Sequence, residues 1–104
     1  MVIYIMLDFK NITGFEWDEG NITKNEPHGV SYLECEEIFY GDPLYITPDE
    51  KHSMTERRFR ALGCTKNGRF LTVIFTLRKQ NSLIRVISAR DIHRKERRLY
   101  EQET

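Results

Sequence analysis

RRFRALGCTKNGRFLTVIFTLRKQNSLIRVISAR, residues 57–90, contains three β-strand candidates in a row, at about 57–65, 69–78 and 83–90. Lys66-Asn67-Gly68 separates the first two, and the polar stretch 79–82 separates the last two. Short polar connections between runs of apolar and β-branched residues are typical of antiparallel hairpins. The stretch therefore predicts a three-stranded antiparallel meander.

The alternation of apolar residues predicts how these strands pair. Odd-numbered positions are apolar in both 57–65 and 69–78, and directly opposed residues share one face of a sheet, so odd positions must pair with odd positions. A three-residue loop at 66–68, with Gly68 left-handed, meets this condition. A four-residue second turn continues the register into 83–90. Unless a β-bulge interrupts it, the face away from the core then collects Arg58, Arg60, Thr76, Arg78 and Arg85.

The segments before the meander show weaker signals. The pattern Ser31-Tyr-Leu-Glu34 is a capping box and predicts a helix over 32–40, with Gly41 as its C-cap. We expect Leu33, Ile38 and Phe39 to face inward. Residues 18–26 are predicted to form a short helix that ends at Pro27.

The remaining segments complete an α+β prediction. Residues 44–47 are predicted to form a strand, 49–56 a polar loop, and 91–101 a final helix. Residues 1–14 are interpreted as an extra strand or a disordered tail. A chain of 104 residues has the usual size of one domain, so we expect a single domain over residues 1–104.

The charge of the chain is divided between its two halves. The net formal charge is zero, but residues 1–56 carry three lysines against twelve carboxylates, and residues 57–98 carry thirteen cations against two carboxylates. Two interpretations follow: the halves neutralise each other in space, or a basic face binds a polyanion.

Guanidinium groups gathered on one face suit phosphate, because each is permanently charged and its planar fork can bind two oxygens. On RNA, such groups could also stabilise the charge that develops when a 2′-OH attacks the neighbouring phosphate. The alternative is that these arginines pair with carboxylates of the acidic half or with a partner protein.

Other kinds of site have little support in the sequence. His28, His52 and His93 lie on separate predicted elements, and no histidine or cysteine pair has the spacing of metal ligands, so we predict no metal site. His28 could transfer a proton near neutral pH, or it could fix its loop by hydrogen bonding. Cys35 and Cys64 are expected to be reduced and partly buried, and without a signal peptide or membrane span we expect a cytoplasmic protein.

Several motifs occur together in the order of one known family. Phe15-Glu-Trp-Asp-Glu19, Asn21 and His28-Gly-Val-Ser31 come first, followed by a Glu-rich helix that ends in Phe39. Glu56-Arg-Arg-Phe59, Phe75-Thr-Leu-Arg78, the stretch 84–90 and Arg94-Lys-Glu-Arg-Arg98 follow. Over residues 15–101 the chain resembles toxins of the BrnT family.

The resemblance implies a RelE-like fold, in which helices flank an antiparallel sheet. It implies an RNA endonuclease of a type II toxin–antitoxin system that needs no metal or other cofactor and is neutralised by a BrnA-type antitoxin. A homodimer of the toxin is also possible. The resemblance implies catalytic roles for Arg58, Arg78, Arg90 and His28. The predicted basic face adds Arg60, Thr76 and Arg85 as RNA-binding residues, and Arg94 of the predicted final helix is a fourth.

The chain departs from the family pattern at Pro27-His28-Gly29, where the family usually has Lys-His-Gly. The cation of that lysine is therefore missing. We accordingly carry a second hypothesis, in which the chain is a catalytically weak or inactive relative that binds a protein or a nucleic acid.

Overall fold

The computed structural model describes residues 2–3, 11–23, 28–52 and 55–104. Strands β1 (Val2–Ile3) and β2 (Gly14–Phe15) precede helix α1 (Tyr32–Tyr40), strand β3 (Leu44–Pro48) and the short 3₁₀ helix η3 (Glu50–His52). Strands β4 (Phe59–Cys64), β5 (Phe70–Arg78) and β6 (Leu83–Asp91) follow, and helix α2 (Arg94–Glu103) ends the chain. The predicted helix end at Pro27 and most of the predicted N-terminal strand or tail lie outside the described residues.

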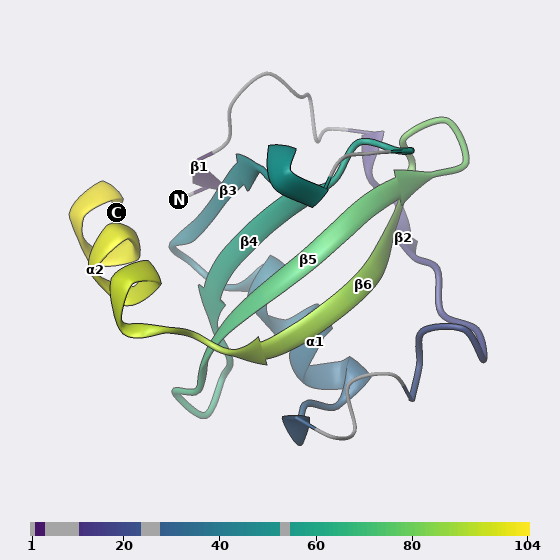
Figure 1. Cartoon of the computed structure of the whole chain (residues 1–104). Helices are drawn as coiled ribbons and strands as arrows, with labels where there is room; N and C mark the ends of the chain where they lie inside the picture. The colour runs from purple at the N-terminus through teal and green to yellow at the C-terminus, as the bar shows by residue number, and fades with distance from the viewer. Residues whose placement is uncertain (1, 4–10, 24–27, 53–54) are drawn as a thin grey trace.

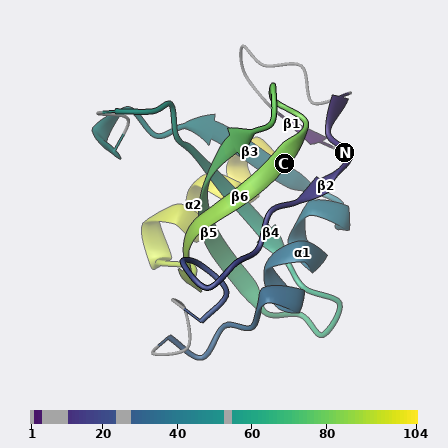
Figure 2. The same cartoon turned by 90° about the vertical axis from the view of Figure 1, so that its right-hand side faces the viewer.

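The strands form one mixed sheet in the order β1-β3-β4-β5-β6-β2. Strands β3 to β6 pair with one another in antiparallel fashion, whereas the short edge strands β1 and β2 pair in parallel with β3 and β6. Helix α1 covers one face of this sheet, and α2 lies on the other side near one edge (Figures 1 and 2). The α+β prediction is therefore confirmed. Among the described residues, no helix is long and apolar enough to cross a membrane.

The first hairpin has the predicted register. Phe59 lies opposite Phe75, and the Thr65 amide donates to the Arg69 carbonyl at 2.8 Å, which leaves a three-residue loop at 66–68. Gly68 in this loop has φ +87°, a left-handed conformation that glycine adopts without a steric penalty.

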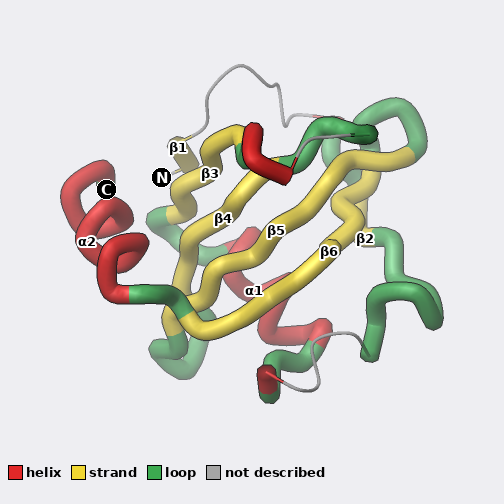
Figure 3. The backbone as a smooth tube through the Cα atoms, viewed as in Figure 1, coloured by secondary structure: helices red, strands yellow, loops and turns green. Residues whose placement is uncertain are grey.

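The second hairpin also begins as predicted and then changes register. Thr76 pairs with Arg85 and Arg78 with Leu83, so the turn has four residues. Phe75 then pairs with Val86 but Ile74 with Ser88, which makes Ile87 the extra residue of a β-bulge. Beyond the bulge the faces exchange, so Ala89 enters the core and Arg90 points to the opposite face. The tube in Figure 3 shows β5 and β6 side by side along their length.

Helix α1 has the predicted bounds and capping box. The Glu34 amide donates to Ser31 Oγ, and the Ser31 amide donates to the Glu34 carboxylate. Gly41 is the C-cap, although its backbone is extended rather than left-handed. The prediction for Leu33 was wrong, because its side chain is 55% exposed. Ile38 is buried and Phe39 packs against the core, as predicted, and Cys35, three residues before Ile38 on the same helix face, is buried as well.

The predicted helix at 18–26 is absent from its described part, residues 18–23, which form a turn. Asp18 Oδ1 accepts from the Gly20 amide, and the buried Asn21 side chain donates to the carbonyls of Glu16 and Val86. Such local hydrogen bonds from Asp and Asn side chains compete with helix formation. The segment therefore folds as a turn fixed to β6.

The sheet has a core on each face. The main core lies between the sheet and α1 and contains Phe75, Val73 and Ile38 at its centre. A smaller cluster between the sheet and α2 contains Tyr45, Leu62 and Tyr100, and the Tyr100 hydroxyl donates to the Pro43 carbonyl at 2.6 Å. The sheet face that carries α2, here called the arginine face, is left open between this cluster and β2.

Candidate functional site

The arginine face holds the predicted arginines, and each is paired with a carboxylate. Residues at positions 58, 60, 76 and 78 lie on the pleat side opposite the core residues Phe59, Ala61 and Phe75. Arg85 joins them through its pairing with Thr76, and Arg90 through the bulge. The shared face is thus as predicted, and the alternative prediction of pairing with the acidic half is also observed.

One group of charges lies where β2, β4, β5 and β6 approach one another. This group, called the Glu56 cluster, contains three arginines and three carboxylates. Glu56 Oε2 accepts a hydrogen bond from Arg78 Nη1, and its Oε1 lies 3.6 Å from Arg58 Nη2. The members of the cluster are Glu16, Asp18, Glu56, Arg58, Arg78 and Arg85.

The arginines of this cluster differ in how firmly they are held. Arg85 donates to Glu16 and Asp18 at 2.9 Å, and its side chain is only 15% exposed. The hydrogen bond to the Asp18 carboxylate raises the pKa of Arg85. Through its contacts with Glu16 and Asp18, Arg85 of β6 fixes β2 and the turn that follows it to β6. Arg58 and Arg78 are 28% and 35% exposed and are therefore more accessible to a ligand.

The second group, called the Glu96 cluster, joins α2 to the sheet. Arg90 makes two hydrogen bonds to the Glu96 carboxylate at 2.7 and 3.0 Å, and Arg60 lies 3.5 Å from the same group. The buried Thr72 hydroxyl and the His93 amide also donate to Glu96. Burial would raise the Glu96 pKa, but the hydrogen bonds from Arg90, His93 and Thr72 outweigh it and lower the pKa to about 2.

His28 lies apart from both clusters. Its side chain is exposed, and its carbonyl accepts a hydrogen bond from Arg69 Nη2 at 3.3 Å. The same Arg69 binds Asp91, which is directly opposite the core residue Leu71. The His28 loop is therefore attached on the α1 side of the sheet.

The other predicted RNA-binding residues have different positions. Thr76 is buried, and its hydroxyl donates to the Arg57 carbonyl at 2.7 Å. Arg94 is exposed in the first turn of α2, outside the sheet. Arg60 remains on the arginine face, with its side chain 30% exposed.

The carboxylates of the face were not among the residues singled out from the sequence. Glu56 could have been found, because it is two and four positions from Arg58 and Arg60, and alternate residues of an extended strand share a face. Glu16 and Asp18 reach the cluster from β2 and its turn, far away in the sequence, so no local pattern points to them.

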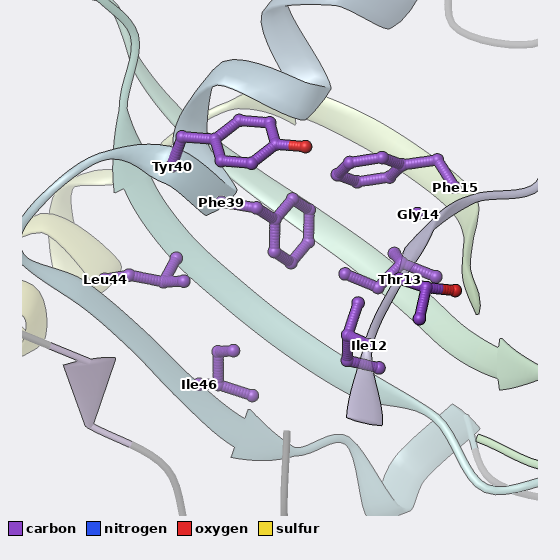
Figure 4. A pocket seen from close by; sticks show the side chains of 9 residues that line it. Ile12, Thr13, Gly14, Phe15, Phe39, Tyr40, Leu44 and Ile46 are labelled. Atoms are coloured by element: carbon purple, nitrogen blue, oxygen red, sulfur yellow. The ribbon is translucent and has the colours of Figure 1, made fainter. Parts of the chain in front are cut away.

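A cavity of about 250 Å³ opens beside Glu56. It is lined by Glu56, Arg57, Phe59, Thr76, Leu77 and Asn81. A second cavity, of about 440 Å³, lies on the α1 side and is apolar, with the Phe39 ring at its centre between residues of α1, β2 and β3 (Figure 4). The first cavity offers a carboxylate and a guanidinium group to a ligand, and a further cavity of about 260 Å³ is lined by Glu37, Asp42 and Lys66 among others.

Metal-binding groups are absent from the arginine face as far as the structure describes it. No group of three or more His, Cys, Asp or Glu side chains is arranged to hold a metal ion within residues 2–3, 11–23, 28–52 and 55–104. Both cysteines are free; Cys35 is buried in the main core, and burial raises the pKa of its thiol to about 12.

Comparison with protein-family models gives one finding for this chain. The model described as "Ribonuclease toxin, BrnT, of type II toxin-antitoxin system" matches residues 17–96. The matched range contains both charge clusters except Glu16. A search of curated proteins finds no match.

Proposed function

The chain belongs to the BrnT family of ribonuclease toxins of type II toxin–antitoxin systems, and we propose that it cleaves RNA on the arginine face without a metal ion. The observation that supports this proposal is the position of Arg58, Arg78 and Arg90, which share one face and keep 28%, 35% and 32% of their side chains exposed.

The proposed chemistry is attack of a 2′-OH on the adjacent phosphate. Negative charge grows on the phosphate oxygens in the transition state, and fixed guanidinium donors stabilise it. Arg58 and Arg78 bind the scissile phosphate, since both contact Glu56, which lines the cavity. Arg90 and Arg60 lie at the Glu96 cluster and bind a neighbouring phosphate.

The carboxylate partners do not prevent this role. An exposed arginine–carboxylate pair contributes only about 0–1 kcal/mol, because water and salt screen it. A phosphate that binds two guanidinium groups with charge-assisted hydrogen bonds can therefore replace such a pair or share the arginines with it. Arg85 and Arg90 are held more firmly, Arg85 by two carboxylates in a largely buried position and Arg90 by the buried Glu96. A phosphate would therefore share Arg90 with Glu96 rather than replace that pair.

For the partner, we propose a BrnA-type antitoxin that neutralises the toxin, and we propose that residues 1–104 act as a single domain. Two further statements stay predictions: His28 transfers a proton in the reaction, and the toxin forms a homodimer. His28 would have to act from the α1 side, to which its loop is attached.

The second candidate function is an inactive relative that binds a protein or nucleic acid. The pairing of every arginine of the face with a carboxylate favours it, since these pairs balance most of the positive charge.

Growth arrest separates the two functions. Induced expression of the native chain in bacteria without the antitoxin should stop growth, and Arg58→Ala with Arg78→Ala should restore it because the phosphate loses both donors. The matched control is Lys66→Ala with Arg98→Ala, which removes the same charge from exposed positions elsewhere. Arrest that persists in the arginine variant while the protein is folded would exclude these residues from the mechanism.

A further inference from the structure

We propose that Glu56 is the general base of the reaction and takes the proton from the attacking 2′-OH. This proposal rests on the proposed function and assigns a catalytic residue that neither the family match nor the sequence identified. It starts from the fact that Glu56 is the carboxylate placed between Arg58 and Arg78.

Glu56 has an oxygen available for this task. Its Oε2 accepts the hydrogen bond from Arg78, whereas Oε1 makes a longer contact of 3.6 Å with Arg58 Nη2 and is therefore held less firmly. The carboxylate is 28% exposed and lines the cavity of about 250 Å³. In the proposed complex, the ribose lies beside Glu56 with its 2′-OH at Oε1, and the phosphate contacts Arg58 and Arg78.

The other carboxylates of the face are less suited to the role. Glu96 has a side chain 10% exposed and accepts hydrogen bonds from Arg90, Thr72 and the His93 amide, so its oxygens are occupied. Glu16 Oε1 accepts from Arg85 at 2.9 Å, and Glu16 does not line the cavity. Asp18 Oδ1 and Oδ2 both accept from Arg85.

The electrostatic setting keeps Glu56 ionised. The Arg78 guanidinium holds the pKa of this carboxyl below its usual value, and Arg58 adds to the effect. A base of low pKa is weak, but it is fully in its reactive form at neutral pH. The fixed cations beside it would lower the barrier further as the phosphate gains charge.

In the proposed step, the bond between phosphorus and O5′ is exchanged for a bond between phosphorus and O2′. Glu56 accepts the 2′-OH proton while O2′ forms a bond to phosphorus, and the bond between phosphorus and O5′ breaks. Water supplies the proton for the departing O5′. The products are a 2′,3′-cyclic phosphate and a 5′-hydroxyl end, and Glu56 returns its proton to water.

The test compares native protein, Glu56→Gln and Glu16→Gln on a single-stranded RNA that contains every dinucleotide step. Glu56→Gln keeps the shape and a hydrogen-bond acceptor for Arg78 but removes the base, so cleavage at pH 7 should fall by about 10²- to 10⁴-fold. The native rate should be flat between about pH 6 and 8, where an acidic carboxyl stays ionised. The rate of Glu56→Gln should instead rise about tenfold per pH unit, since hydroxide must then remove the proton. Glu16→Gln should keep the flat profile.

Measuring RNA binding shows whether Glu56 acts as a general base or only holds Arg58 and Arg78 in position. A 2′-O-methyl copy of the RNA lacks the nucleophile, and Glu56→Gln should bind it at least as tightly as native protein because a negative charge is removed. Weakened binding that matches the loss of cleavage, or cleavage within about threefold of native, would overturn the role of Glu56. If native protein itself does not cleave the RNA, the proposed function fails, and this inference fails with it.

Discussion

At the residue scale, Glu96 is the carboxylate on which the arginine face depends most. It is buried against β4, β5 and β6 and binds Arg60, Arg90 and Thr72, and its position in α2 fixes the helix to the sheet. A buried charge is tolerated only where it is paired and hydrogen-bonded, as it is here. Glu96 therefore fixes the position of the Arg90 side chain and also stabilises the fold.

The lowered pKa of Glu96 predicts that the stability of the fold depends on pH. The folded pKa of Glu96, about 2, is below its ordinary value of 4.5, so its contribution is complete above about pH 4.5 and is lost as the pH falls toward 2. A shift of this size corresponds to about 3 kcal/mol. Urea unfolding of Glu96→Gln at pH 7 should show a loss of this order, and the difference from native protein should shrink toward pH 3. A difference that is constant with pH would contradict the assignment.

At the element scale, the contact of α1 with β4 sets how closely the helix approaches the sheet. A Cβ added at Gly63 would lie 2.9 Å from Ile38 Cβ and 3.3 Å from the Ile38 carbonyl oxygen. Neither atom is the free end of a flexible side chain, so the helix itself would have to move. The glycine is thus required by close packing rather than by backbone conformation.

Gly63→Ala should therefore lower the free energy of unfolding by about 1–3 kcal/mol, the usual cost of overpacking a core. Gly14→Ala is the control, since its new Cβ would meet Leu83 at an ordinary 3.7 Å and should change stability by less than about 0.5 kcal/mol. Thermal or urea unfolding measures both. Equal stability of the two variants would mean that α1 is packed less closely than the structure shows.

Much of this element structure could be predicted from the sequence, because it depends on local chemistry. The Ser31–Glu34 capping box determines the start of α1, and matching apolar alternation with Gly68 determines the first hairpin. The bulge at Ile87 could not be predicted, because neither Gly nor Pro marks it. The second turn is similar, since Lys79, Gln80 and Asn81 all have positive φ without a glycine.

The candidate site could be predicted in part for the same reason. Strand alternation placed Arg58, Arg60, Arg78 and Arg85 on one face, but Arg90 reaches that face only through the bulge. The pairing of Arg85 with Glu16 and Asp18 depends on the parallel edge pairing of β2 with β6. Such long-range pairing leaves no local pattern in the sequence.

At the scale of the whole molecule, the two oppositely charged halves of the sequence meet on one face. Carboxylates from the acidic half, Glu16, Asp18 and Glu56, lie against Arg58, Arg78 and Arg85 of the basic half. The net charge of the chain is zero, so long-range attraction of a polyanion is weak, and the proposed binding of RNA would depend on contacts at short range. The arginines must therefore exchange or share their carboxylate partners when a phosphate binds.

The central claim is that these arginines cleave RNA without a metal ion. The most direct test is RNA cleavage by purified protein in the presence of EDTA, comparing the native chain with Arg58→Ala/Arg78→Ala and with the control Lys66→Ala/Arg98→Ala. Native protein and the control should cut the RNA and leave 2′,3′-cyclic phosphate ends, and the arginine variant should be at least about 100-fold slower while remaining folded. Cleavage that stops in EDTA, or that continues unchanged in the arginine variant, would contradict the claim.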